Sequence, residues 1–146
     1  SSRLFKKLVY NDQIAINVGG SSITPEDPGL FEVVVEIRPG ISHKKVLPVI
    51  FGEIERMSQR GVSLNELQKA KNQIMKNWVD SVKTIHGKDQ VLVLNEVVTG
   101  SYENLFNDLL KYEKISQSDV QRVAKKYLVK NNRTIVSLFP QKGKSK

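Results

Sequence analysis

The residues best suited to catalysis or metal binding in this chain are its two histidines, His43 and His86. A zinc-binding helix places a second histidine or a glutamate three or four residues from the first, so that both side chains reach the same ion. Neither histidine has such a neighbour in the sequence. We therefore predict that both lie at helix ends, His43 near an N-terminus and His86 at a C-terminus, where a cation is favoured.

Other patterns that could serve a reaction have simpler explanations. The run Gly-Gly-Ser-Ser at 19–22 suggests a phosphate-binding loop, but no Gly-Lys-Ser/Thr follows it and no helix starts there, which favours a strand bulge. Glu32 and Glu36 share one face of a predicted strand, as surface carboxylates commonly do opposite a buried face. There is no Gly-x-Ser-x-Gly turn and no cysteine. The sequence thus predicts no catalytic, cofactor-binding or metal-binding residue, no bound zinc, and no peptide hydrolysis by this chain alone.

Six segments carry apolar residues at every third or fourth position, which predicts helices. They lie near 1–10, 47–57, 64–86, 89–98, 102–112 and 119–127. Ser63 and Glu66 form a capping box at the start of the longest helix, and Ser116 or Ser118 caps the last. Pro48 is expected in the first turn of its helix or at a kink, because it lacks a backbone N–H.

Three segments alternate apolar and polar residues and predict strands. The first turns Ile14, Ile16 and Val18 to one face and is expected to break or bulge at the glycines 19 and 20. The second, at 30–37, turns its apolar residues to one face and its glutamates to the other. The third, at 134–139, follows a turn at the asparagines 131 and 132.

These elements predict an α+β fold with a small antiparallel or mixed β-sheet, covered on one face by a layer of helices. We expect a single domain over residues 1–140, followed by a basic, disordered tail at 141–146. Three strands are few for so many helices. The sheet is therefore expected to be incomplete, or to pair with another chain at an exposed edge.

The composition is that of a folded, soluble chain, since 39% of the 146 residues are hydrophobic and 26% are charged. No apolar stretch reaches the length that crosses a membrane. The net charge of +8 would attract nucleic acid, but the lysines are scattered and few aromatic residues lie among them, which disfavours a nucleic-acid partner. A cysteine-free chain suits the cytoplasm and the periplasm of a bacterium equally well.

Four stretches of the chain, in their order and spacing, are similar to a known family. They are SSRLFKKLVY at 1–10, DPGLF at 27–31, LNELQKAKNQ at 64–73 and SDVQRVAKKYL at 118–128. Together they resemble the second, non-catalytic domain of the pitrilysin or insulinase clan of zinc peptidases, particularly bacterial zinc proteases related to the mitochondrial processing peptidase. The resemblance runs from end to end and implies a metallopeptidase-like αβ sandwich, incomplete at its N-terminus.

The resemblance implies a function without catalysis on this chain. In that clan, zinc is held in the first domain by His-x-x-Glu-His and a distant glutamate, and the motif does not occur here. The chain would instead be a substrate-enclosing domain that gives extended peptide a chamber wall with backbone and apolar contacts, while zinc belongs to the parent enzyme. The implied partners are the zinc-bearing domain of the same chain or of a partner subunit, the peptide substrate and, through an exposed sheet edge, another copy of this chain. No membrane partner is implied.

One departure from the family bears on which half of the enzyme this is. The partner half of such enzymes carries an arginine and, seven residues later, a tyrosine that help to position substrate, and Val9 and Ile16 stand at those positions. We therefore expect that the chain comes from the zinc-bearing half, or from a degenerate subunit. Two alternatives stay open: a structural subunit like the peptidase-derived core proteins of respiratory complexes, and, less favoured, a basic nucleic-acid-binding module.

Overall fold

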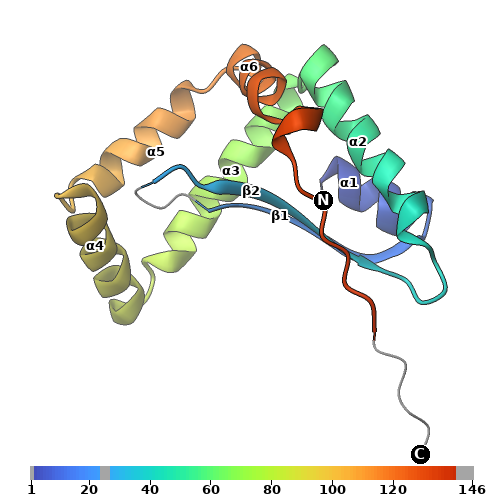
Figure 1. Ribbon diagram of the computed structural model, residues 1–146. Coiled ribbons are helices and arrows are strands. Elements are labelled where there is room, and N and C mark those ends of the chain that lie inside the picture. The colour runs from blue at the N-terminus through green and yellow to red at the C-terminus, as the bar shows by residue number, and fades with distance from the viewer. Residues whose placement is uncertain (1, 24–26, 141–146) are drawn as a thin grey trace, which may run out of the picture.

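A computed structural model describes residues 2–23 and 27–140, apart from the side chains of residues 105, 106 and 108. The predicted tail at 141–146 lies outside the described residues. In chain order the elements are α1 (Arg3–Phe5), the π-helical η1 (Lys6–Asn11), β1 (Ala15–Ile23), β2 (Leu30–Ile37), α2 (His43–Arg60), α3 (Leu64–Ser81), α4 (Ile85–Thr99), α5 (Asn104–Lys114), α6 (Gln117–Tyr127) and the 3-10 turn η2 (Lys130–Asn132). Figure 1 shows the hairpin of β1 and β2 beside these helices, and the α+β prediction with a small antiparallel sheet is confirmed.

The hairpin contains an irregularity that the sequence pattern did not locate. Ala15 pairs with Ile37 and Asn17 with Glu36, so Ile16 is an extra residue in β1. A bulge of this kind reverses the alternation of the strand. Ala15 is consequently fully buried and Ile16 is 47% exposed, so the prediction that Ile16 shares an inward face is wrong. The prediction of a break or bulge at the two glycines is also wrong, because both lie inside β1 and pair with β2.

The buried core lies where the N-terminal helices meet the start of β1 and the first half of α2. Leu8 and Ala15 are fully buried and Val46 is 2% exposed. Partly buried apolar side chains surround them: Leu4, Val9, Ile14, Val18, Val35, Ile37, Ile41, Val49 and Ile50. At the other end of α2, α6 packs back onto the helix, where Gln121 donates from Nε2 to the carbonyl oxygens of Ser58 and Gln59.

Several helix boundaries follow local chemistry. The capping box at Ser63 and Glu66 is confirmed, and Ser116 rather than Ser118 caps α6 in a second box with Asp119. Pro48 lies inside α2, beyond its first turn, so α2 lacks one backbone donor there. Among the described residues, no helix is long and apolar enough to cross a membrane.

The predicted long helix over 64–86 is wrong at its C-terminal end, because α3 ends at Ser81 and α4 begins at Ile85. The Thr84 hydroxyl caps α4 by accepting the Gly87 N–H at 3.0 Å. A Cβ atom at Gly87 would lie 1.9 Å from the carbonyl oxygen of Ser81, so the two helices approach this closely only because residue 87 is glycine. His86 therefore lies in the first turn of α4 and not at a helix C-terminus, while His43 begins α2 as predicted.

The predicted strand at 134–139 does not form, and within the described ranges the sheet has two strands. A strand needs a neighbour for its backbone hydrogen bonds, and the segment has none among those residues. It leaves η2 as a single length of chain (Figure 1). Its two ends contact α2: the Arg133 guanidinium carbon lies 3.6 Å from the ring centre of Phe51, and the rings of Phe139 and His43 meet edge-on at 5.4 Å.

Candidate functional site

The part of the chain that the structure describes contains no group of three or more metal-ligating side chains placed to hold an ion. His43, at the start of α2, contacts the ring of Phe139, and His86 lies at the start of α4. Two surface depressions among the described residues are each lined by one helix face, a polar face of α3 and a basic face of α6. One exposed helix face does not surround a ligand, so neither of these two depressions encloses a reaction.

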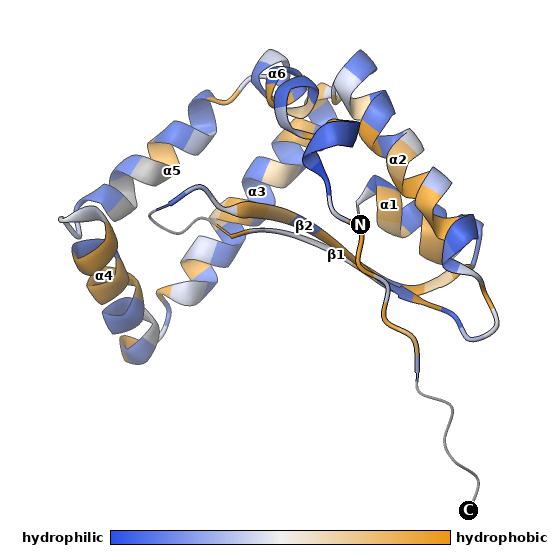
Figure 2. Ribbon diagram, viewed as in Figure 1, coloured by the Kyte–Doolittle hydropathy of each residue, from blue (hydrophilic) through white to orange (hydrophobic). Residues whose placement is uncertain are grey.

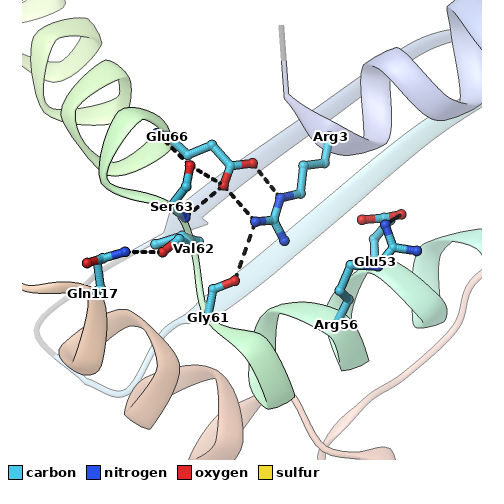
Figure 3. Close-up of polar contacts among 8 residues, drawn as sticks. All are labelled: Arg3, Glu53, Arg56, Gly61, Val62, Ser63, Glu66 and Gln117. Carbon is cyan, nitrogen blue, oxygen red and sulfur yellow. Dashed lines mark hydrogen bonds and ion pairs between the residues drawn. The ribbon is translucent and has the colours of Figure 1, made fainter.

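A polar cluster joins α1 to the turn between α2 and α3 (Figure 3). Arg3 donates from Nε to Oε1 of Glu66 at 2.5 Å and from Nη2 to Oε2 at 2.6 Å, a two-point ion pair. Nη2 also reaches the carbonyl oxygen of Gly61 at 3.4 Å. The backbone N–H of Ser63 donates to the same carboxylate at 2.9 Å. One guanidinium thus fixes both the end of α2 and the start of α3.

These donors set the ionisation of the Glu66 carboxyl. The hydrogen bonds from Arg3, followed by that from the Ser63 backbone, lower the pKa of Glu66 to about 2, against the smaller opposing effect of burial. The same contact raises the pKa of Arg3. Both groups are therefore charged at neutral pH, and Glu66 has no proton to donate in a reaction near neutrality.

A second carboxylate lies close to this cluster. Glu53 is only 7% exposed and accepts one ion pair, from Nη1 of Arg56 to its Oε1 at 3.0 Å. Its Oε2 and the Nη1 of Arg3 are both buried with no hydrogen-bond partner among the described residues. Buried polar atoms of opposite charge are normally satisfied by each other or by water. The cluster therefore acts as an anchor between helices through two formed ion pairs, Arg3–Glu66 and Arg56–Glu53.

The turn between α2 and α3 receives a further contact from the C-terminal part of the chain. Gln117, the first residue of α6, donates from Nε2 to the carbonyl oxygen of Val62 at 2.5 Å. Val62 lies between the C-cap of α2 and the N-cap of α3, and the donated hydrogen bond from Gln117 ties this turn to α6. The sequence predicted the capping box but not Arg3 or Gln117 as its neighbours, because both contacts join residues more than fifty positions apart.

The other outstanding feature is the amount of apolar surface left open. In α4, Val93, Leu94, Val97 and Val98 are all more than half exposed, and no residue of the helix is buried. Figure 2 shows apolar residues along α4, β2 and the C-terminal segment. A helix that is apolar on several sides is normally buried. The accessible surface of the chain is 11651 Å², against roughly 7,600 Å² for a compact monomer of this mass.

Two further positions from the sequence analysis are now placed. Val9 lies in η1 and packs against the core, whereas Ile16 stands exposed at the bulge of β1. Glu32 and Glu36 are both exposed on β2. The structure therefore brings none of these side chains together as a polar site.

Comparisons with known proteins relate this chain to inactive peptidase domains. Residues 1–74 match the family model described as the peptidase M16 inactive domain. The inactive peptidase domain of a proposed zinc protease from Bordetella parapertussis is similar over 99% of this chain and 78% of its own, with 26% identity and a TM-score of 0.84. A proposed zinc protease from Bordetella pertussis Tohama I is similar over 97% of this chain and 76% of its own, with 27% identity and a TM-score of 0.80.

A curated relative extends the comparison. Cytochrome b-c1 complex subunit 2, mitochondrial, of Rattus norvegicus is 23% identical over 128 residues, which are 88% of this chain and 28% of that protein. The chain thus spans less than a third of the length of that relative. The family model covers half of the chain, and the chain belongs to the peptidase M16 inactive domain family. The resemblance drawn from the sequence is confirmed.

Proposed function

We propose that this chain is a non-catalytic, substrate-enclosing domain of a zinc metalloendopeptidase of the pitrilysin and insulinase clan. It would bind extended peptide for cleavage by a zinc site on another domain. The observation that carries the proposal is its likeness, over 99% of its length, to the inactive peptidase domain of a proposed zinc protease. Zinc belongs to the parent enzyme in this proposal, and this chain supplies no ligand to it.

A domain without catalytic groups still accelerates a reaction when it holds the substrate. Fixing a peptide beside a metal site removes translational and rotational freedom that would otherwise oppose the reaction. An enclosing wall also keeps bulk water from the reacting groups. The exposed apolar residues of the hairpin and of α4 are suited to this role, because they offer contact area without a competing charge.

The same exposed apolar surface is suited to contact with a partner domain. The chain exposes roughly 4,000 Å² more than a compact monomer of its mass would. We propose that the zinc-bearing domain, on the same polypeptide or on a partner subunit, covers part of this excess. An extended peptide held between the two domains would cover more of it.

The relative from a respiratory complex favours a second candidate. Cytochrome b-c1 complex subunit 2 is described as a subunit of that complex, so a chain of this family can serve in an assembly. In this alternative the chain is a structural subunit, and its assembly cleaves no peptide. The coding sequence separates the two first, because a His-x-x-Glu-His motif about 200 residues upstream, one domain unit away, favours the peptidase.

Reconstitution gives the direct test. The zinc-bearing domain of the parent enzyme is assayed on an internally quenched, unstructured peptide, with and without this chain. We expect cleavage to rise at least about 100-fold when the chain is added, to stop with a chelator, and to be absent with this chain alone. Equal cleavage without the chain contradicts the enclosing role, and no cleavage by the complete, zinc-loaded assembly supports the structural subunit.

A further inference from the structure

Glu53 is a buried carboxylate that the proposed function does not use. It lies inside α2 and is only 7% exposed. Its Oε1 accepts an ion pair at 3.0 Å from Nη1 of Arg56, whose side chain is 52% exposed. Its Oε2 is shielded from solvent and has no hydrogen-bond partner among the described residues. A buried charged oxygen without a donor is strongly unfavourable, so a donor is expected at this atom.

A complementary donor lies on α1. Arg3 uses Nε and Nη2 to bond Glu66 and Gly61, whereas its Nη1 is shielded from solvent and bonds to no described residue. The hydrogen bond to Glu66 is the main cause that raises the pKa of Arg3, and the charge of Glu53 adds to it, so the two side chains are near one another. In Figure 3 the unbonded end of the guanidinium lies on the side of Glu53.

The chemistry of the two atoms selects what can join them. No hydrogen bond links Nη1 of Arg3 to Oε2 of Glu53 directly. A cation between them would be repelled by the guanidinium and an anion by the carboxylate. A water molecule is neutral, accepts from an arginine N–H and donates to a carboxylate, so it satisfies both atoms at once.

The burial of these two atoms makes the argument internal to the chain. Both atoms are shielded from solvent by the packing around them. A segment or a domain outside this chain would therefore reach them only by displacing that packing. Their partner is thus expected to be small enough to lie inside the fold, as buried water molecules do.

We propose that Arg3 and Glu53 hold an ordered internal water molecule between Nη1 and Oε2. Arg3 then serves two carboxylates, Glu66 directly and Glu53 through water. The water completes a chain of hydrogen bonds that starts at Arg56 on the surface and ends at Glu66 on α3. It fastens α1 to the interior of α2, in addition to the contact with Gly61 at its end. The proposal is independent of the peptidase role.

A crystal structure of the full chain at about 1.8 Å tests the water site directly. We expect a density peak within about 2.6–3.2 Å of both Nη1 of Arg3 and Oε2 of Glu53. Glu53→Met removes the acceptor and should abolish the peak. The control Glu55→Met, at an exposed position of the same helix, should leave it in place. A direct bond between Arg3 and Glu53, or no ordered peak between them, overturns the proposal.

A double-mutant cycle measures the same link in solution. Arg3→Met and Glu53→Met should each lower the Tm, because each leaves the other charge without its bridged partner. The double variant should lose at least about 3 °C less than the sum of the two single losses. The control cycle of Arg3→Met with Glu55→Met should be additive within about 1.5 °C.

Arg3→Lys distinguishes a bridging guanidinium from a simple positive charge. A single ammonium group does not present separate nitrogens to two carboxylates. Crossed with Glu53→Met, it should retain less than half of the coupling measured with Arg3→Met. Coupling between Arg3 and Glu53 no larger than in the control cycle overturns the proposal. The crystallographic test on the parent chain needs no variant, so it decides the matter even where a variant fails to fold.

Discussion

Two regions of the molecule differ sharply in how far their apolar side chains are buried and their polar groups are hydrogen-bonded. Where α1 and η1 pack along α2, apolar side chains are buried. The Arg3 guanidinium is hydrogen-bonded to Gly61 at the end of α2 and to Glu66 of α3. In the region of α4 and residues 134–139, apolar side chains are exposed and the backbone segment lacks strand partners among the described residues. The first region contains the buried core, and the second exposes apolar area suited to contact with another protein.

The largest expected effect on the free energy of unfolding is that of Leu8→Ala in the buried core. Leu8 is fully buried, so the substitution removes apolar contacts and leaves a cavity. We expect a loss of about 3 kcal/mol in the free energy of unfolding. Urea denaturation followed by circular dichroism measures it. A loss below about 1 kcal/mol would mean that this corner is not the core of the fold.

The junction of α3 and α4 gives a matched pair of glycine substitutions. In a helix, Gly→Ala alone stabilises by up to about 1 kcal/mol. Gly52→Ala in α2 should show that gain, since its Cβ would meet nothing within 4 Å. Gly87→Ala should instead destabilise by about 1–2 kcal/mol, since its Cβ would strike the Ser81 carbonyl oxygen. Equal effects in thermal unfolding would show that the close approach of the two helices is not required.

Removal of the Arg3 ion pair should lower the free energy of unfolding by a smaller amount, and this loss should depend on pH. Arg3→Ala should cost about 1 kcal/mol at pH 7, because the ion pair is partly exposed to solvent. The pKa of Glu66 is lowered to about 2 in the folded chain, so the stability it contributes is present above its unfolded pKa and is lost as pH falls toward 2. The difference between the parent chain and Arg3→Ala should therefore shrink steadily below about pH 4.5.

Chemical denaturation at a series of pH values between 7 and 2.5 follows that difference. Arg3→Lys keeps the charge but loses the two-point geometry, and it should fall between the other two proteins. A difference that stays constant over the whole range would show that Arg3 acts through packing of its side chain rather than through the Glu66 carboxylate.

The smallest effect is expected in the second region. Val97 is 78% exposed on α4, so Val97→Asp should change the free energy of unfolding of the isolated chain by less than about 0.5 kcal/mol. The same substitution should weaken binding to the zinc-bearing domain, because it places a charge in an apolar contact. A large loss of stability in the isolated chain would show that α4 already packs against its own fold.

The sequence was sufficient for features that depend on neighbouring residues. The capping box at Ser63, a helix N-terminus near His43 and the span of β2 all follow from local patterns, and the structure has each of them. The break before α4 was also local, since Thr84 and Gly87 have the spacing of a helix cap, but the apolar periodicity continued across it and suggested one helix.

Other features depend on residues distant in the sequence or on other molecules. The bulge at Ile16 is a matter of register between β1 and β2, which alternation alone does not fix. The pairing of Arg3 with Glu66 joins residues 63 positions apart. Residues 134–139 have the pattern of a strand and no partner within the described chain, so their sequence predicts a tendency that only a neighbouring strand can satisfy.

Hydrogen exchange on the chain, alone and with the zinc-bearing domain of its parent enzyme, tests the contrast most directly. In the isolated chain, amides of η1 and of the first half of α2 should exchange at least about 100-fold more slowly than those of α4. Addition of the zinc-bearing domain should slow exchange in α4 and leave the Leu8 region unchanged. Equal protection of the two regions without any partner, or unchanged exchange in α4 when the zinc-bearing domain is bound, would contradict the account.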